Sequence, residues 1–271
     1  MNVNRLSIII ITAIWSILLN GQSGFTSLGG ANFLGYSRAG VNLAGIESIY
    51  LNQAGLVGVK NFAVDLSVEK RFNLADLSNG SIALAKSFKF GTMGLMFSSF
   101  GITEYNEQKL GFAYARKLNS NISIGGQFDM LRYNVASVGS IHLVSFELGI
   151  QLRLNKDFSV ATHIFSPGNI EVTDGTEIGT RFRIGVKYAP SAKVFVLAEL
   201  DKVIDRDIDY KLGIGYQLID LMQLRVGMDP KLNTYSFGIM LKFKDTYKVS
   251  SAISVNHSLG NTPAISLQYQ Q

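Results

Sequence analysis

The chain has 271 residues, of which 47% are hydrophobic and 17% charged, and its formal net charge is +5. It contains no cysteine, which excludes disulfide bonds, thiolate metal sites, catalytic thiols and lipidation on an N-terminal cysteine. The positive charge is slight and scattered along the chain, so we expect no nucleic-acid partner.

Residues 1–22 have the pattern of a secretory signal peptide. Arg5 supplies the positive start, residues 6–19 are apolar, and small or polar residues follow. The alternative is a membrane anchor of marginal length, since this apolar run is shorter than the roughly 20 residues of a membrane-spanning helix. We predict a signal peptide that is cleaved near Gly21 to Ser23.

Residues 23–60 form the next unit, and its centre, residues 28–56, is rich in small residues and lacks a strand period. Glycine and alanine let a backbone fold back tightly, and asparagine can satisfy local backbone groups where no regular ladder exists. We interpret this segment as a compact hatch that plugs a lumen. The alternative is an irregular N-terminal linker, because chain termini often lack order.

From Phe62 onward, apolar residues recur with a period of two. Phe146, Leu148 and Ile150, for example, alternate with polar or small residues. Such alternation predicts strands with one greasy and one largely polar face. The same alternation recurs at 181–188, 210–217, 222–229 and 236–243.

About fourteen such segments can be counted, most of them about 9 to 12 residues long, as a tilted strand needs to cross a bilayer. Tight turns, as at 155–157, alternate with wider loops, as at 167–179. Outer-membrane barrels show this asymmetry, with short periplasmic turns and an even strand number. We therefore predict an all-β fold, in which residues 61–271 form a transmembrane antiparallel β-barrel in the outer membrane of a Gram-negative bacterium, surrounded by its lipid.

A soluble two-sheet sandwich or lipid-binding barrel is the alternative, with the greasy faces as its core and the polar faces in water. Periodicity alone does not separate inside from outside. Sparse charge, tyrosine and phenylalanine near strand ends, and the leader all favour the membrane barrel.

In a membrane barrel the polar strand faces line the lumen. Their charges would form either a permeation path or a packed interior of paired ions. We favour pairing, because an unpaired buried ion is costly and a barrel of this strand number is narrow. The candidate lumen charges are Asp129, Glu147, Arg153, Arg181, Arg183, Lys187, Glu199, Lys211, Arg225 and Lys242.

Catalytic and metal-binding patterns are weak. His142, His163 and His257 lack metal-ligand spacing and read as loop or strand-end residues. The aspartates at 205–209 are spaced as in the start of a calcium loop, but Tyr210 stands where the turn glycine belongs. We expect no enzymatic activity, no cofactor and no bound metal.

The hatch carries the one family signature. Ser-Arg-Ala-Gly-Val-Asn-Leu-Ala from Ser37 and Ile-Tyr-Leu-Asn-Gln-Ala-Gly-Leu from Ile49 resemble the N-terminal signature of FadL-like outer-membrane barrels, and within them the PorV/PorQ branch of the Bacteroidota. In that family an Arg-Ala-Gly or similar element leads to Asn-Pro-Ala-Gly-Leu before the first strand. Gln53 stands where the family usually has proline. The candidate hatch site consists of Arg38, Asn52, Ala54 and Gly55.

The resemblance implies a fourteen-stranded barrel with an N-terminal hatch and leaves two functions open. FadL-like proteins pass hydrophobic small molecules through the barrel wall, whereas PorV-like proteins serve a type IX secretion machine. Short outer loops and a charged lumen favour the second. Our leading hypothesis is a non-enzymatic accessory subunit of an outer-membrane complex for protein secretion or surface-protein assembly, whose partner is a larger barrel or a surface lipoprotein. The alternative is a FadL-like passive channel for small hydrophobic compounds.

Overall fold

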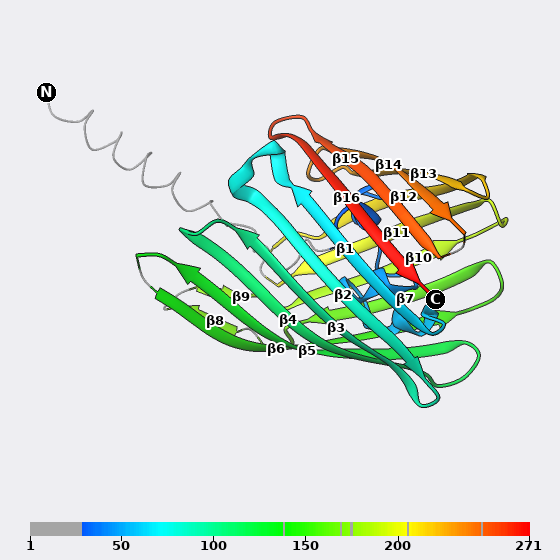
Figure 1. The fold of residues 1–271 in the computed structure, drawn as a ribbon, viewed down its shortest axis with the longest axis horizontal. Coiled ribbons are helices and arrows are strands. Elements are labelled where there is room, and N and C mark those ends of the chain that lie inside the picture. Colours follow the sequence, from blue (N-terminus) through cyan, green and yellow to red (C-terminus); the bar gives the residue numbers. More distant parts are fainter. Residues whose placement is uncertain (1–28, 138, 169, 174–175, 205, 245) are drawn as a thin grey trace, which may run out of the picture.

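A computed structural model describes residues 29–137, 139–168, 170–173, 176–204, 206–244 and 246–271. The predicted signal peptide and the first residues of the predicted hatch lie outside them. In the described part of the chain, fourteen antiparallel strands close a barrel around a hatch (Figure 1). This confirms the predicted fold class. None of the described helices is long and apolar enough to cross a membrane.

The wall strands follow one another around the ring in chain order. They are β1 (Phe62–Lys70), β2 (Ser78–Phe88), β3 (Gly91–Gly101), β4 (Tyr105–Lys117), β5 (Ile122–Val135), β6 (Gly139–Arg153), β7 (Phe158–Phe165), β10 (Arg181–Tyr188), β11 (Val194–Val203), β12 (Asp209–Ile219), β13 (Met222–Asp229), β14 (Thr234–Phe243), β15 (Tyr247–Asn256) and β16 (Gly260–Gln270). β1 closes the ring on β16, where Ala63 lies opposite Gln270.

Two connections between wall strands in the described chain contain short helices or strands. The short 3-10 helices η4 (Arg71–Asn73) and η5 (Ala75–Leu77) follow β1. The strands β8 (Ile170–Thr173) and β9 (Thr176–Ile178) form a separate two-stranded sheet after β7. The sequence pattern predicts only a loop there. That prediction is wrong in this detail, because these strands are too short for a period of two to stand out.

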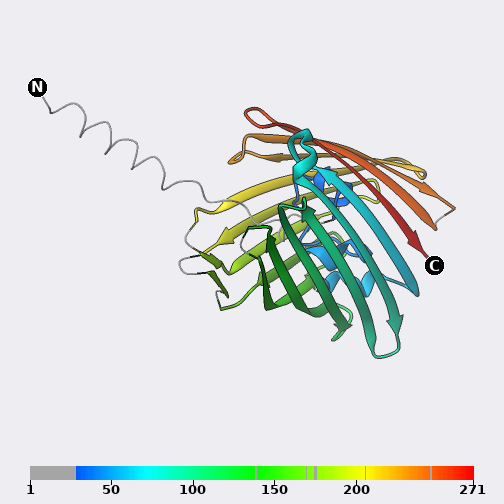
Figure 2. The same cartoon turned by 60° about the vertical axis from the view of Figure 1, so that its left-hand side comes forward.

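The connections define two edges of the barrel. At the tight-turn edge, Asn155 accepts the backbone N–H groups of Asp157 and Phe158, each at 2.9 Å, which reverses the chain within a few residues. β1 begins and β16 ends at this edge, and the C terminus lies there (Figures 1 and 2). The opposite edge, which carries the β8–β9 connection, is named the loop edge.

The barrel exterior is apolar. On β6 the side chain of Leu148 is 58% exposed, whereas that of its neighbour Glu147 is 2% exposed. Aromatic side chains gather near the tight-turn edge, where the rings of Phe88 and Phe90 stack at 5.2 Å. Exposed apolar surface of this extent, with aromatic residues at its margin, faces lipid in membrane barrels and would be unfavourable in water. The barrel therefore sits in a membrane, and the soluble sandwich is ruled out because the polar faces point inward.

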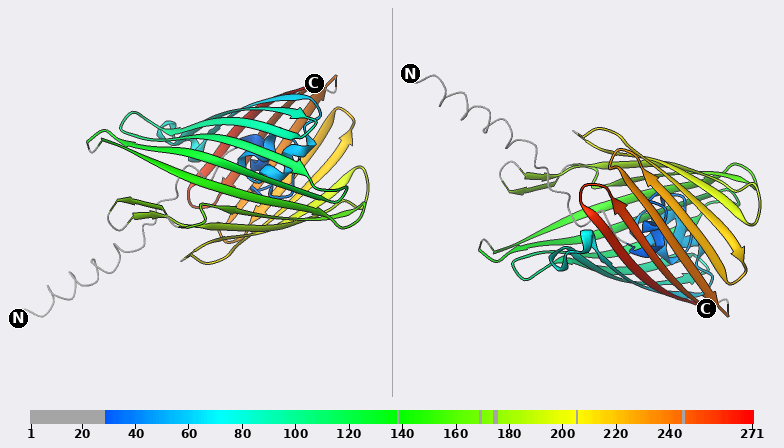
Figure 3. Two further views of the ribbon diagram at one scale, coloured as in Figure 1. Left: turned by 90° about the horizontal axis from the view of Figure 1, so that it is seen from below. Right: turned by 90° about the horizontal axis from the view of Figure 1, so that it is seen from above.

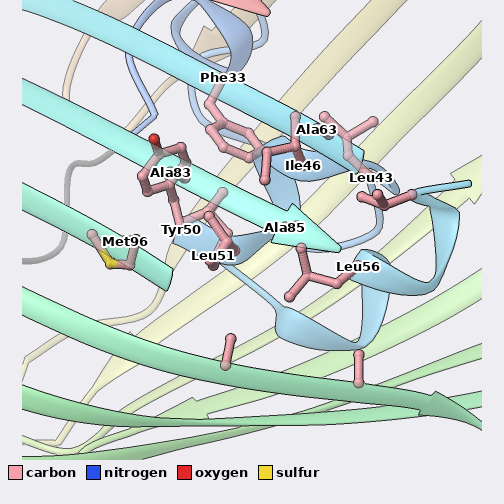
Figure 4. Packing of buried hydrophobic residues seen from close by; sticks show 14 of the residues in the cluster. Phe33, Leu43, Ile46, Tyr50, Leu51, Leu56, Ala63, Ala83, Ala85 and Met96 are labelled. Atoms are coloured by element: carbon pink, nitrogen blue, oxygen red, sulfur yellow. The ribbon is translucent and has the colours of Figure 1, made fainter. Parts of the chain in front are cut away.

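The hatch fills the lumen with the helical segments α2 (Ala31–Leu34), η2 (Ile46–Tyr50) and η3 (Gln53–Gly58) (Figures 2 and 3). Its apolar side chains pack together and against small residues of the neighbouring wall (Figure 4). Ala63, Ala83 and Ala85 leave room there for side chains such as Phe33 and Leu56. The main hydrophobic core of the protein therefore lies between the hatch and the wall.

Elsewhere the hatch backbone rests directly on wall glycines. A Cβ on Gly125 would overlap the backbone of Gln53 and Ala54, and a Cβ on Gly227 would overlap the backbone of Tyr36. Glycine is needed at both positions because two main chains approach more closely than any side chain allows. The small residues on the polar strand faces are thus the seat of the hatch.

Candidate functional site

The residues of the predicted hatch motif lie where the hatch folds on itself and meets the wall. The Asn52 side chain caps η3 by accepting the backbone N–H of Ala54 at 3.1 Å. The same side chain donates to the carbonyl oxygens of Val41 in the hatch, at 3.0 Å, and of Thr162 on β7, at 3.2 Å. Ala54 is fully buried, and a Cβ on Gly55 would overlap hatch backbone.

Two further hatch side chains reach charged wall residues. Arg38 lies 2.5 Å from the Glu69 carboxylate on β1, which Arg71 approaches to 3.5 Å. The Gln53 amide donates to the Glu147 carboxylate on β6 at 2.7 Å and to the Ile49 carbonyl at 3.1 Å. A proline at this position has no such donor. The departure from the family pattern therefore gives this hatch a contact with the wall.

A continuous layer of ionisable side chains crosses the lumen between the hatch and the loop edge. We name it the charge layer, and it comprises Lys109, Asp129, Glu147, His163, Arg181, Arg183, Glu199, Asp201 and Lys211. These residues come from seven consecutive wall strands, β4 to β7 and β10 to β12. The layer holds four cations, four carboxylates and one histidine, and a fifth carboxylate, that of Asp209 at the start of β12, lies 3.8 Å from Lys211.

Lys109 is the centre of the β4–β7 half of the layer. Its ammonium group contacts the Glu147 carboxylate and lies 3.1 Å from that of Asp129, and each of the three residues is at most 2% exposed. His163 Nε2 lies 2.8 Å from the second Glu147 oxygen, and His163 Nδ1 lies 3.5 Å from Arg183. Ions buried this completely are tolerated because each has a partner of opposite charge.

Asp201 is the centre of the β10–β12 half. Arg181 binds both of its carboxylate oxygens at 2.6 Å, which is the bidentate geometry of a strong charge-assisted pair. Lys211 lies 2.6 Å and Arg183 3.6 Å from the same carboxylate. One carboxylate thus holds three cations in place.

Wall carboxylates also hold the hatch backbone and a hatch hydroxyl. Glu199 accepts the backbone N–H groups of Gly40, at 2.8 Å, and of Val41, at 2.9 Å. Asp65 on β1 accepts the hydroxyl of Tyr50 at 2.9 Å. Burial first, and then the charge of Asp65, raise the pKa of the Tyr50 hydroxyl well above its ordinary value, so the hydroxyl remains a donor.

On the other side of the hatch a cavity of about 320 Å³ opens at the tight-turn edge, and we name it the turn-side mouth. Its lining includes Lys117, Arg153, Lys156 and Lys187, with Asp157 as the carboxylate. Among the described residues, no carboxylate oxygen lies within 4.0 Å of any of these four cations. The cations of the mouth therefore make no close ion pair, unlike those of the charge layer, although Glu47 of the hatch attracts Lys187 at longer range.

The predicted lumen charges divide among these regions. Arg225 lies elsewhere, 3.4 Å from the Ala31 carbonyl of the hatch, and Lys242 is half-buried at the turn end of β14. Arg153 and Lys187 line the mouth, and no carboxylate oxygen of the described residues lies within 4.0 Å of either. The charge layer contains Asp129, Glu147, Arg181, Arg183, Glu199 and Lys211.

Several residues of the site are missed by the sequence analysis although their signal is present. Asp65 and Glu69 alternate with the apolar residues of β1, and Lys109 and Asp201 hold the same inward register on their strands. His163, read as a loop or strand-end residue, lies on the inward face of β7. A strict count by twos assigns all five to the lumen. Among the described residues, no group of three or more His, Cys, Asp or Glu is placed to hold a metal.

The wall is incompletely paired beside β6, toward the loop edge. β5 pairs with β6 from Gly139 onward, but β7 joins β6 only from Glu147, which lies opposite Phe165. The chain then leaves the wall at Ser166, which has a φ of 51° and donates to the Phe146 carbonyl at 2.9 Å. Residues 139–145 have no ladder partner on this side in the described chain, and β8–β9 forms its own sheet nearby (Figure 3). We name this opening the seam.

An apolar cluster lies on the lumen side of the seam. It consists of Leu131, Tyr133, Leu143, Phe165 and Ile178, and we name it the seam cluster. Leu131 is 1% and Phe165 4% exposed. The cluster rests on the charge layer, since the Lys109 ammonium lies 5.0 Å from the centre of the Phe165 ring.

The seam lies at the margin of the lipid-facing belt. Outward side chains of β6 change from Phe146 and Val144 to His142 and Ser140 along the unpaired stretch. An unpaired strand edge is costly in hydrocarbon but tolerable where polar groups or water can reach it. The seam therefore opens at the level where the membrane surface begins.

Comparisons with known proteins establish the fold. No family model and no curated protein matches the sequence. The solved structure of the CymD monoaromatic hydrocarbon channel matches with a TM-score of 0.69 at 13% identity, over 92% of this chain and 99% of that chain. The Ralstonia pickettii toluene transporter TbuX matches with a TM-score of 0.68 at 10% identity, over 91% and 99%. A Pseudomonas aeruginosa FadL homologue matches with a TM-score of 0.66 at 11% identity, over 90% and 99%.

The chain has the fold of these channels. At such low identity the likeness concerns architecture, and what passes through the barrel has to be argued from its own residues. Those residues place an apolar patch beside the seam, a layer of paired charges next to it, and the hatch beyond that layer.

Proposed function

We propose that this protein is a FadL-like outer-membrane channel without enzymatic activity, which lets small hydrophobic compounds cross passively. The observation that carries the proposal is the seam cluster, an apolar patch inside the lumen directly behind an unpaired stretch of wall. Burial of apolar surface there is favourable by about 25 cal/mol per Å². The seam offers such a compound a sideways route into lipid.

The charge layer and the hatch argue against a straight route. An apolar solute moving on from the seam cluster meets Lys109, Asp129 and Glu147, and separating these buried ions is costly. Beyond them the hatch packs against the wall. Passage through the wall, as the resemblance to FadL-like proteins implies, avoids both obstacles. Two of the matched structures, a monoaromatic hydrocarbon channel and a toluene transporter, support this substrate class by analogy.

The two edges of the barrel give its orientation. Outer-membrane barrels place short turns and both chain ends on the periplasmic side. The tight-turn edge, with the start of β1 and the end of β16, is therefore the periplasmic edge in this proposal. The seam then faces the outer leaflet of the outer membrane of a Gram-negative bacterium.

Closing the seam tests the proposal. The chain has no cysteine, so Leu143→Cys with Ile178→Cys supplies a unique thiol pair within the seam cluster. We expect a bifunctional methanethiosulfonate to abolish toluene uptake, and a reductant to restore it. Uptake is measured across a bilayer whose outer leaflet is lipopolysaccharide, since a plain phospholipid bilayer already passes apolar solutes.

A matched pair in a closed part of the wall is the control. Thr234→Cys and Asn256→Cys lie opposite each other in the β14–β15 ladder near the loop edge, and cross-linking them should leave uptake unchanged. Uptake that survives closure of the seam, or that equals uptake into protein-free vesicles, would contradict the channel.

The second candidate is an accessory role in protein secretion of the type IX kind or in surface-protein assembly. The likeness of the hatch motif to the PorV/PorQ branch favours it. Its partner would be a larger outer-membrane barrel or a surface lipoprotein. Affinity purification of the tagged protein in mild detergent should then recover that partner in a fixed ratio, and recovery of a lone monomer counts against the role.

A further inference from the structure

The turn-side mouth is a charged cavity that neither candidate function uses. Four cations, Lys117, Arg153, Lys156 and Lys187, line it with the single carboxylate of Asp157, so its formal charge is 4 − 1 = +3. Cations that converge on a cavity without carboxylate partners are free to bind an anion from solution.

Strand register places Arg153 and Lys187 in one row of the wall, since both lie opposite Ser159 on β7. On β6, Arg153 is two residues beyond Gln151, whose amide donates to the hatch carbonyl of Leu43 at 2.9 Å. On β10, Lys187 is two residues beyond Gly185, where a Cβ would overlap the hatch side chain of Val41. Both cations therefore lie one inward position past the hatch, and Lys117 lies in the row of Gln151, because both are opposite Ser123 on β5.

Lys187 is held without being neutralised. Its ammonium group lies 4.5 Å from the centre of the Phe195 ring, a cation–π contact that fixes the side chain and leaves its charge available. Asn42 of the hatch is fixed as well, by hydrogen bonds of 2.8 Å and 3.2 Å with Ser159 on β7. The inner end of the cavity is thus a preorganised polar surface, which lowers the entropic cost of binding.

The walls between the cations are partly apolar. Ala44 and Val57 of the hatch and Ala189, just past the end of β10, line the same cavity, whose volume of about 320 Å³ accommodates more than a bare inorganic ion. A ligand that matches this lining has an anionic head group and an apolar remainder.

We propose that the turn-side mouth binds a small organic anion, in which a carboxylate or phosphate head group is joined to an apolar remainder. Lysine and arginine bind such groups through charge-assisted hydrogen bonds, and arginine can do so with two parallel bonds. The site lies on the side of the hatch away from the charge layer. The proposal rests on the geometry of the mouth alone, and it holds whether the barrel serves as a channel or as an accessory subunit.

Calorimetric titration of the purified full chain in neutral detergent tests the site. The probes are benzoate and phenyl phosphate, with benzamide as the uncharged analogue of benzoate. We expect both anions to bind and benzamide not to bind. In the variant Lys117→Gln/Arg153→Gln/Lys187→Gln, anion affinity should fall at least about tenfold, because several charged hydrogen bonds are lost.

The control variant is Lys89→Gln/Lys193→Gln/Lys244→Gln. It removes the same amount of charge from exposed turns of the same edge, outside the cavity lining, and should change affinity by no more than about twofold. Neither variant strands a paired carboxylate, so both should fold, and heat-modifiable migration on gels checks this. Lack of anion binding by the wild type, equal loss in both variants, or binding of benzamide as tight as that of benzoate would overturn the proposal.

Nanodiscs distinguish a soluble anion from a lipid head group as the source of the ligand. Weaker benzoate binding in discs containing phosphatidylglycerol than in discs of phosphatidylcholine identifies an anionic lipid head group as an occupant of the site. Equal binding in both identifies a soluble anion.

Discussion

The charge layer and the turn-side mouth share strands, but their charged side chains are in opposite environments. β6 contributes Glu147 to the layer and Arg153 to the mouth, and β10 contributes Arg183 to the layer and Lys187 to the mouth. In the layer every ion has a partner, whereas in the mouth the cations have none among the described residues. Pairing is thus imposed where water is excluded and relaxed where water enters.

The hatch is what separates the two regions. Between Glu147 and Arg153 the inward positions of β6 are Gly149 and Gln151, and both meet the hatch. The side chain at Gly149 is absent because Asn52 occupies its place. Along β6, the inward positions therefore change from a buried ion at Glu147, through two residues that contact the hatch, to a solvated cation at Arg153.

Replacing one lysine in each region should show the difference between the two regions most clearly. Lys109→Ala leaves Asp129 and Glu147 as buried carboxylates without their cation, and we expect it to lower the free energy of unfolding by about 3–5 kcal/mol. Lys117→Ala, eight positions along the same strand, should stay within about 0.5 kcal/mol of wild type. Denaturant unfolding in detergent, followed by circular dichroism, measures both. Equal losses would mean that the mouth is as dry as the layer.

Displacing the hatch from the wall should open a continuous path between the charge layer and the turn-side mouth. Gly125→Leu places a side chain where the backbone of Gln53 and Ala54 lies, and overpacking of this kind costs about 1–3 kcal/mol. The hatch can yield while the barrel stays closed, so we expect ion conductance across planar bilayers to appear or rise. Gly80→Leu is the control, because nothing lies within 4 Å of a Cβ at that position on β2. If the conductance of the Gly125→Leu barrel equals that of wild type, the hatch is not the barrier to ions.

The barrel itself could be predicted from the sequence because lipid on one side and a polar lumen on the other impose a period of two on every strand. Alternation places Glu147 and Arg153 on one face, as observed. It does not give their depth relative to the hatch. That depth depends on contacts between distant segments, such as Gly125 against Gln53, which leave no local signal.

The seam could not be predicted for a related reason. β6 alternates without interruption along its length, and nothing in it signals that β7 ends opposite Glu147. The signal lies in the partner, where the chain leaves the wall at Ser166 and Pro167 follows. Strand pairing is a property of two segments, whereas periodicity reports on one.

Replacing Glu199 should separate its two roles, as a hydrogen-bond acceptor for the hatch backbone and as a partner in an ion pair. Glu199→Ala takes away the acceptor of the Gly40 and Val41 N–H groups, and leaving these buried donors unsatisfied should weaken hatch seating by about 1–3 kcal/mol. Glu199→Gln keeps an acceptor oxygen and should cost less. Proteolysis of the hatch in the folded barrel measures seating. If the two variants are cleaved equally fast, the charge of Glu199 and not its hydrogen bonds to the hatch is what matters.

The smallest expected effect is the pH dependence of hatch seating that arises from the Tyr50 hydroxyl. The pKa of Tyr50 is raised in the folded protein, first by burial and then by Asp65, so the protonated phenol is favoured there. Its contribution to hatch seating is complete below the ordinary tyrosine pKa near 10 and is lost as pH rises above it; at pH 11 the loss is about 1.4 kcal/mol. Tyr50→Phe should weaken seating by about 1 kcal/mol at pH 7, since Asp65 loses a donor, but should show less further loss between pH 9 and 11. The difference between wild type and variant isolates the contribution of Tyr50. Parallel pH profiles of hatch proteolysis in the two proteins would show that the alkaline loss does not arise at this buried hydroxyl.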